Sequence, residues 1–517
     1  MKHRKRADGG LLHRFDLRRG TVGFCIWGVF CASGAVAQTA QGLRVVPRFS
    51  VSETWTDNLD LRSTAKDAAL ITTLSPGLSM SSSSGRIRGA LDYALNGLLY
   101  TKTQNDKGHV QHALSAQVHV DAVENWLVVD GNASISQQAV SAFGVVAPSA
   151  GAGRPGQNTS EVASVSLSPS VKGVLAGRVG YDARVNVAQS HAKDSVAGDN
   201  RSTSASLSFS GAGGGALNWS AALSMNAARP SGGRSTKTQS ASGSLNLTPD
   251  PDIRGSLTAG LERSDLSTNA SRSSSTYGLG AVWTPSPRTT ADLNWQRHDY
   301  GNTHSLSFQH RMARSVWRIS DSQSVSNPGV QGAAGLRSNY DLFFLQFASI
   351  EPDPVKRDQL VRAFLAANGL SPDAIVTSGF LSGSSSLSRR QDASVSLEGL
   401  RSTLTFTFNR NRTQRLDPAS AVQDDLSQSG LVLQRGWSLS LSHRLTPESS
   451  LSVVLSDQAS RGDSSQLATD LKSVIANWNV RLGGRTTLQL TLRHVSFDSV
   501  TQPYTENAVL ATLVRQF

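Results

Sequence analysis

Residues 505–517 have the sequence TENAVLATLVRQF, which ends in a phenylalanine. Side chains in this stretch alternate between an apolar and a polar face at the period of two that a β-strand has. The apolar face carries Val509, Ala511, Leu513 and Phe517, and the polar face carries Thr512 and Gln516. Arg515 interrupts the apolar face. The stretch predicts an amphipathic strand that ends the chain.

The same alternation recurs from Val45 onward, in short segments separated by turns rich in Gly, Ser, Asn and Asp. Segments with this pattern include 91–96, 114–121, 181–187, 205–209, 217–225, 277–283 and 292–296. Apolar residues make up only 38% of the chain, which also contains 45 glycines. A membrane barrel needs apolar side chains on its outward face alone. The expected fold is therefore all-β, a transmembrane antiparallel outer-membrane β-barrel with residues 38–517 as its single domain.

The amino terminus, residues 1–37, has the organisation of a signal peptide. Seven Lys and Arg residues precede an apolar run at 21–32, and Ala35-Val36-Ala37 supplies a small-x-small cleavage pattern. The run is shorter than the roughly 20 residues of a membrane-spanning helix. We expect cleavage after Ala37, which leaves too little chain before the first strand for an amino-terminal plug domain.

Both cysteines, Cys25 and Cys31, lie in the predicted signal, so disulfides and thiol chemistry are not expected after export. The signal also holds seven basic and two acidic residues. Subtracting these from the 50 basic and 38 acidic residues of the chain leaves 43 and 36, so the net charge falls from +12 to +7. The high isoelectric point is therefore weak support for nucleic-acid binding, and no nucleic acid is expected as a partner.

Connection lengths predict the strand count and the orientation. Short connections at 124–125, 176–177, 248–253, 284–288, 445–448 and 483–484 alternate with longer ones at 144–159, 192–201, 265–273, 417–429 and 498–506. Outer-membrane barrels place short turns in the periplasm and long loops outside. This alternation holds along the chain only if 305–325 is two strands with a turn at 312–314. About 22 strands result, with both termini on the periplasmic side.

One insert, residues 327–386, departs from the strand pattern. Asp353 is a plausible helix N-cap with Pro354 at the first helical position, and Gly369 is a stop signal. The apolar stripe of this predicted helix includes Leu360, Phe364 and Leu365. Such a stripe must be buried, so we expect an extracellular or lumenal insert that folds over or into the barrel mouth.

Polar residues on the inward face of the predicted strands are candidates to line a pore. They are Asn246, Asn294, Gln296, Asn479, Arg481, Gln489 and Arg493. Histidines and carboxylates are spread along the strands rather than clustered, as a catalytic or metal site would require. We therefore predict no enzyme activity, no metal and no cofactor. The weak candidates for such sites are Ser442 with His443, His494 with Ser496, and His298 with Asp299.

Several short motifs, taken in order, resemble a known family. They are Glu53-Thr54-Trp55-Thr56-Asp57-Asn58, residues 71–78 with Ser75-Pro76-Gly77, Asp92-Tyr93, and the insert around Asp353-Pro354-Val355-Lys356-Arg357. In this order they resemble the outer-membrane β-barrel proteins associated with the PEP-CTERM/exosortase system of Gram-negative bacteria. The resemblance implies a setting with exopolysaccharide synthesis and export, and it implies no catalytic residues.

The functional hypothesis is a channel or gated pore of the outer membrane, associated with exopolysaccharide export or extracellular matrix assembly. The alternative is a non-conducting structural or scaffolding barrel. Expected partners are outer-membrane lipid and the barrel assembly machinery that recognises the last strand. The channel hypothesis adds exopolysaccharide and its export proteins.

Overall fold

The computed structural model describes residues 42–82, 85–101, 109–145, 158–193, 195–211, 215–268, 270–331, 361, 379–416 and 423–517. The predicted signal peptide, 1–37, lies outside these residues. So do Leu360, Phe364 and Leu365 of the predicted insert helix, although Val361 beside them is helical and has no exposed surface.

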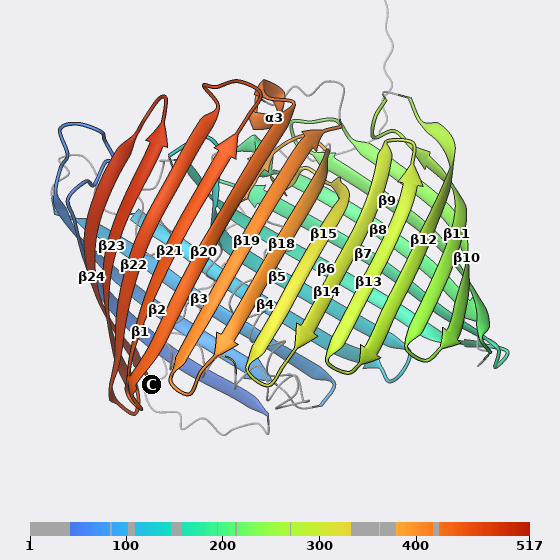
Figure 1. Cartoon of the computed structure of the whole chain (residues 1–517), viewed down its shortest axis with the longest axis horizontal. Coiled ribbons are helices and arrows are strands. Elements are labelled where there is room, and N and C mark those ends of the chain that lie inside the picture. The colour runs from blue at the N-terminus through green and yellow to red at the C-terminus, as the bar shows by residue number, and fades with distance from the viewer. Residues whose placement is uncertain are drawn as a thin grey trace, which may run out of the picture. The chain divides into compact units, whose positions relative to one another are not determined.

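Within the described residues, the sheet has 24 strands, of which two, β16 and β17, have three residues each. The other 22 form a closed antiparallel barrel (Figure 1). Each wall strand pairs with its neighbours in sequence, and β15 pairs with β18 across the insert. The wall closes where β1 pairs with β24, from Arg48 opposite Gln516 to Thr56 opposite Ala508. The predicted all-β barrel of about 22 strands is confirmed.

The first half of the wall consists of β1 (Leu43–Thr56), β2 (Ala69–Ser82), β3 (Ile87–Tyr100), β4 (His109–Val123), β5 (Leu127–Ala139), β6 (Thr159–Leu175), β7 (Val179–Ala192), β8 (Asn200–Gly211), β9 (Leu217–Pro230), β10 (Thr236–Asp250) and β11 (Ile253–Ser264). The second half consists of β12 (Arg272–Ser286), β13 (Thr289–His298), β14 (Gly301–Arg311), β15 (Ser315–Ser326), β18 (Ser386–Glu398), β19 (Ser402–Arg415), β20 (Leu431–Thr446), β21 (Ser449–Arg461), β22 (Ala468–Gly483), β23 (Thr486–Ser499) and β24 (Tyr504–Gln516). The elements outside the wall are β16 (Gly329–Gln331), β17 (Phe380–Ser382), the 3-10 helix η1 (Val196–Gly198) and α3 (Asp425–Gln428).

The two ends of the barrel differ in their connections, as the sequence predicts. One end has short turns such as 124–126, 176–178 and 251–252, and the carboxyl terminus lies there. The other end carries the longer loops, including 140–158, 416–430 and the insert, with 299–300 as a short exception. The turn at 312–314 divides β14 from β15, which confirms the predicted split. We assign the end with the short turns to the periplasm.

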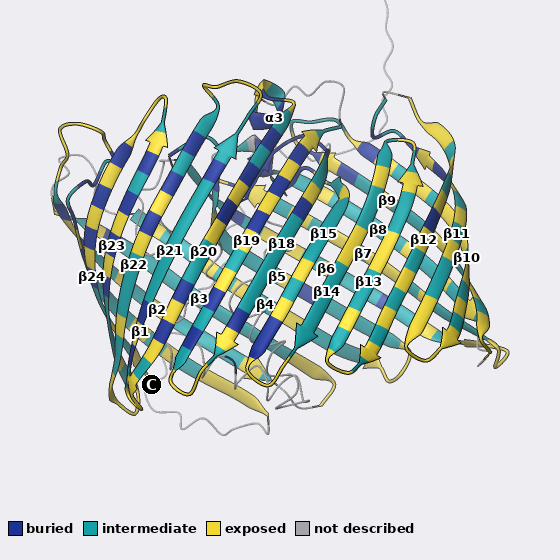
Figure 2. Cartoon of the chain, in the orientation of Figure 1, coloured by how far each residue is buried: buried dark blue, intermediate teal, exposed yellow. Residues whose placement is uncertain are grey.

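The outside of the wall carries an apolar belt between two levels of aromatic side chains. Leu223, Leu257 and Leu279 lie within the belt, and each is at least half exposed in the isolated chain. Exposed and less exposed residues alternate along the strands in Figure 2. Tryptophans near the periplasmic turns are Trp219, Trp283, Trp317 and Trp478, and those nearer the long loops are Trp55 and Trp437.

In a closed barrel, every backbone N–H and C=O group within the membrane can form a hydrogen bond to a neighbouring strand. The apolar outward belt and the aromatic girdles match the lipid and its two interfaces. The chain is therefore a protein of the Gram-negative outer membrane. On its last strand, Val509 and Leu513 face outward, and the guanidinium of Arg515 lies 5.6 Å from the ring centroid of Phe517. In the part of the chain that the structure describes, no helix combines the length and apolar character of a membrane span.

Candidate functional site: the lumen and its mouth

The inner wall of β4 to β8 is polar and uncharged around a groove of about 430 Å³. Its lining comes from side chains that alternate with outward apolar residues such as Val118 and Val165. The inward lining residues are Ser115, Gln117, Asn132, Ser134, Ser164, Ser166, Ser190, Asn200 and Ser202. This part of the wall can therefore offer hydroxyl and amide groups to a solute without attracting either sign of charge.

Hydroxyl groups on neighbouring strands are paired across this face of the wall. Ser134 Oγ lies 2.7 Å from Ser164 Oγ, and Ser224 Oγ lies 2.7 Å from Ser240 Oγ. In each pair the donating hydroxyl keeps its acceptor lone pairs, and the accepting hydroxyl keeps its donor hydrogen and one lone pair. The wall can therefore exchange its internal hydrogen bonds for bonds to a passing solute at little cost.

The predicted pore residues of β10 and β13 lie on the inner face. Asn246 alternates with the exposed Leu245 and Leu247, and its Nδ2 donates to Ser220 Oγ at 3.1 Å. Asn294 and Gln296 flank Trp295 on β13, on the face opposite to Leu293 and Trp295. That these residues line a conducting pore stays a prediction.

The other four predicted residues lie on the inner face of β22 and β23. Asn479 pairs in register with Gln489, so the structure brings these two together, and Arg481 follows on the same face. Arg493 differs, because its side chain is only 4% exposed and forms a 2.9 Å ion pair with Glu506. Thr56 Oγ1 donates to the same carboxylate at 2.8 Å.

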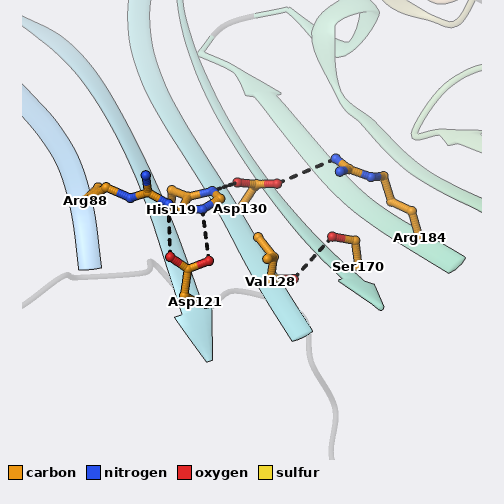
Figure 3. A network of polar contacts seen from close by, with 7 residues as sticks. All are labelled: Arg88, His119, Asp121, Val128, Asp130, Ser170 and Arg184. Atoms are coloured by element: carbon orange, nitrogen blue, oxygen red, sulfur yellow. Dashed lines mark hydrogen bonds and ion pairs between the residues drawn. The ribbon is translucent and has the colours of Figure 1, made fainter. Parts of the chain in front are cut away.

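Near the periplasmic turns, the inner face of β3 to β7 carries a charge band (Figure 3). We define it as Arg88, His119, Asp121, Asp130 and Arg184. Arg88 lies 3.0 Å from Asp121, and His119 Nδ1 lies 2.7 Å from Asp130 Oδ1. Arg184 approaches the other Asp130 oxygen at 3.6 Å. The two arginines and two aspartates balance, so the band presents paired charges rather than a net field.

The band is continued toward β1 by a second pair. Arg48 forms a bidentate contact with Asp92, at 2.6 and 2.5 Å, and Ser79 Oγ donates to Asp92 at 2.6 Å. These groups are between about a quarter and a half exposed, so each pair contributes about 1 kcal/mol or less to stability. Each pair brings opposite charges together on the inner face of the wall.

At the opposite end, a short hairpin folds over the mouth. We call β16 and β17 the mouth hairpin. Gly329–Gln331 pairs with Phe380–Ser382, and Phe380 pairs in parallel with Ala139 at the end of β5. β5 is the fifth wall strand, and β18, which follows the hairpin, is the sixteenth of 22, so they lie half the wall apart. The described ends of the insert therefore fold inward across the lumen.

Two adjacent aspartates at the start of α3 hold this arrangement together. Asp424 Oδ2 accepts hydrogen bonds from Ser382 Oγ at 2.7 Å and from the Gly383 amide at 2.9 Å. Asp424 also caps α3 through Ser427. Asp425 accepts from Ser141 Oγ at 2.7 Å and from the Ala142 amide at 2.5 Å. The loop before β20 thus joins the mouth hairpin to the loop after β5.

Apolar side chains pack beneath these hydrogen bonds. Phe380 belongs to a buried cluster with Ala142, Leu426 and Val432. Leu381 packs with Val162, Ala192 and Ala197, which belong to β6, β7 and η1. A third cluster brings Val145 of the loop after β5 against Phe497 and Tyr504. The mouth loops therefore form a packed layer.

The Asp425 carboxyl group lies in a loop outside the membrane-spanning strands. Burial raises the pKa of Asp425 above its ordinary value, and the hydrogen bonds from Ser141 and Ala142 lower it only in part. The nearby Asp424 carboxylate raises it further. Protonation of Asp425 is therefore easier in the packed mouth than in an open one.

The histidine of each weak catalytic or metal candidate contacts another side chain, as His494 does with its Nδ1 2.7 Å from Asn507 Oδ1. Ser442 is buried on the inner face, whereas His443 is on the outer face with Nδ1 2.8 Å from Ser402 Oγ. His298 is held by Glu262 at 2.8 Å and by Thr303 at 3.1 Å. Within the described residues, no three His, Cys, Asp or Glu side chains are arranged to hold a metal ion.

Sequence reasoning missed the charge band and the two aspartates of α3. The band was detectable in part, because Asp121 and Asp130 flank a predicted turn and therefore lie on facing strands. Asp424 with Ser427 matches the spacing of a helix cap. No sequence pattern indicates that Asp424 contacts Ser382, because the two residues lie in separate loops that are 42 residues apart.

No protein-family model and no curated protein matches the sequence. Solved structures similar to the chain include the FrpB iron transporter from Neisseria meningitidis, F5-1 variant, with 11% identity over 92% of this chain and 82% of that chain and a TM-score of 0.46. The siderophore receptor PirA from Pseudomonas aeruginosa has 10% identity over 91% and 80%, with a TM-score of 0.41. OccK11 (OpdR) from the same organism has 10% identity over 92% and 98%, with a TM-score of 0.34. These scores are too low to support an argument about function.

Proposed function

We propose that the chain is a gated channel of the outer membrane for an extracellular polysaccharide. The observation that carries the proposal is the polar, uncharged groove on the inner wall of β4 to β8, with the paired hydroxyls of Ser134 and Ser164 and the amide groups of Asn132 and Asn200. Sugar hydroxyls can replace such hydrogen bonds one at a time. A polymer would therefore be held weakly at many points and could slide.

The charge band supports the same substrate class. Because Asp121 and Asp130 are each paired with a basic group, the charge band offers small ions paired rather than isolated charges. The resemblance to PEP-CTERM-associated barrels gives an independent reason to propose exopolysaccharide and its export proteins as partners. The proposal includes no catalytic step.

The mouth hairpin is the proposed gate. Its contacts with Ala139 and Asp424 hold it across the lumen. The resting channel is then expected to be narrow, and passage of a polymer requires the hairpin to leave its contacts.

The test is permeation of neutral dextran fractions into proteoliposomes, with lumen and lipid-face variants compared at adjacent positions. Ser164→Trp and Ser166→Trp place bulk in the groove, whereas Val165→Trp places the same bulk on the outside. We expect the two inner variants to slow dextran entry and the outer variant to match the wild type. Equal entry for all three would contradict the proposed path.

The packed clusters around Phe380 and Leu381 favour a second candidate, a non-conducting scaffold. Replacement of 327–385 by a short Gly-Ser linker distinguishes the two functions. A channel should gain conductance in planar bilayers when the insert is removed. A barrel that remains silent with and without the insert would be a scaffold.

A further inference from the structure

Four arginines lie on the outside of β18 to β20, just beyond the apolar belt. We call Arg389, Arg410, Arg412 and Arg435 the arginine cluster. Arg410 and Arg412 follow the outward Phe406 and Phe408 along β19, with the buried Asn409 and Asn411 on the other face. The cluster therefore faces the membrane side of the wall, not the lumen.

The cluster contains two pairs of like charge directly across neighbouring strands. Arg389 lies opposite Arg412, and Arg410 lies opposite Arg435. Facing like charges destabilise a sheet. An anion between the guanidinium groups would remove this cost and could accept bidentate hydrogen bonds.

Negative side chains nearby neutralise only part of the cluster. Asp321 on β15 forms a 2.6 Å ion pair with Arg389, and its carboxylate also contacts Gln391 and His304. On β21, the outward Asp457 lies opposite Trp437 and Lys472. Across β15 and β18 to β20, outward arginines number four and outward carboxylates one, which leaves +3. Within the described residues, no ion pair engages Arg410, Arg412 or Arg435.

The position of the arginine cluster along the membrane normal indicates which anion it contacts. Phe408 and Trp437 are paired in register at the upper aromatic girdle, and Arg410 and Arg435 lie two residues further toward the long loops. Two strand residues correspond to about 7 Å along the strand, or about 5 Å along the membrane normal at the roughly 40° tilt of barrel strands. That distance beyond the girdle corresponds to the headgroup layer of the outer leaflet.

We propose that the arginine cluster binds the phosphate groups of a phosphorylated glycolipid in the outer leaflet. The lipid's acyl chains would lie along the apolar surface of Phe406, Phe408 and Trp437, and its phosphates would bridge the facing arginines. Such a lipid would be retained at one place on the barrel exterior, beside the strand that follows the insert.

The test measures binding of lipid A with two phosphate groups to the purified full chain in detergent, by native mass spectrometry. Arg410→Gln, Arg412→Gln and Arg435→Gln together should weaken binding on the order of 100-fold, given about fivefold for each basic residue. Arg178→Gln, Arg288→Gln and Arg401→Gln remove the same charge from exposed periplasmic turns and should leave binding unchanged. A gel mobility shift on heating checks that each variant is folded.

Two measurements on the wild type keep the proposal testable even if the triple variant does not fold. Dephosphorylated lipid A should bind about as weakly as the triple variant binds the phosphorylated form, and inorganic phosphate at millimolar concentration should not displace the lipid. Equal binding of both lipids would overturn the proposal. Displacement by inorganic phosphate would show a site for free phosphate and would also overturn it.

Discussion

Phe380 of the mouth hairpin pairs in parallel with Ala139, the last residue of a strand half the wall away. Neighbouring wall strands pair antiparallel, so this contact is of a different kind from the wall ladders. It fixes the described ends of the insert over the lumen. Any motion that takes the mouth hairpin away from the end of β5 must break it.

A disulfide at this contact should lock the mouth. The sequence has no cysteine after Cys31, so Ala139→Cys with Phe380→Cys introduces the only two thiols of residues 38–517. Strand neighbours have the separation that a disulfide needs. We expect low conductance under oxidising conditions and an increase on reduction, in planar bilayers. The single Ala139→Cys variant is the control, and equal conductance in both redox states would exclude this contact as the gate.

Asp424→Ala should loosen the mouth without affecting the wall. The change removes the acceptor for Ser382 and Gly383 and the cap of α3, and loss of a cap alone costs about 1 kcal/mol. We expect faster protease cleavage of the insert and higher conductance. Asp463→Ala, in the next outer loop, is the matched control. Unchanged cleavage in Asp424→Ala would mean that the apolar packing alone holds the hairpin.

Lowering the pH should favour the closed mouth through Asp425. The pKa of Asp425 is raised in the closed form, so protonation of this carboxyl stabilises the closed mouth. This stabilisation is fully present below the ordinary carboxyl pKa of about 4 and is lost as the pH rises through the raised value. We expect open probability to increase from acid to neutral pH. Asp425→Asn should flatten this dependence, and a wild-type channel without any dependence would contradict the assignment.

Breaking the buried pair of Arg493 and Glu506 should destabilise the barrel. Both side chains are nearly inaccessible, so either charge left alone is costly, about 3–5 kcal/mol. Arg493→Met should therefore unfold at lower urea concentration in lipid, and Arg493→Met with Glu506→Leu should recover most of the loss. A double variant as unstable as the single one would indicate that packing, not charge, is responsible.

Removing Asp130 should make the channel select anions. Asp130 is bonded to His119 and approached by Arg184, so Asp130→Asn leaves an excess of positive charge in the charge band. The reversal potential in a KCl gradient should shift toward that of chloride. Asp252→Asn, in an exposed periplasmic turn, is the control, and the same potential in both variants would place the band outside the ion path.

The wall was predictable from the sequence because its chemistry is periodic. Val509 and Leu513 face outward as their spacing indicates. The short turn at 312–314 divides β14 from β15 and so makes the number of wall strands even. Successive side chains of a strand point to opposite faces, so the face of a residue can be predicted from its immediate neighbours in the sequence. That is why the spacing of Asn246, Asn294 and Gln489 along their strands is enough to assign them to the inner face.

The specific contacts within the mouth were not predictable, because they are not periodic in the sequence. Asp425 contacts Ala142, which is 283 residues away, and nothing periodic connects the two. Likewise, Arg493 matches the pattern of an open lumen residue, yet it is paired with Glu506 on the next strand and only 4% of its side chain is exposed. Local patterns predict the face of a residue but not what folds over that face.

The seam between β1 and β24 has a consequence for how the protein is made. Ser52 and Thr512, 460 residues apart, are joined there by a 2.8 Å hydrogen bond, whereas the other ladders of the wall form between successive strands. Bringing such distant segments together costs conformational entropy on the order of 5 kcal/mol, and contacts this distant slow folding. Until it forms, both strands expose unpaired amides and carbonyls that cannot enter lipid. Pairing of β1 with β24 is therefore the step that removes the last free edges of the wall, and until then both edges are sites of possible aggregation.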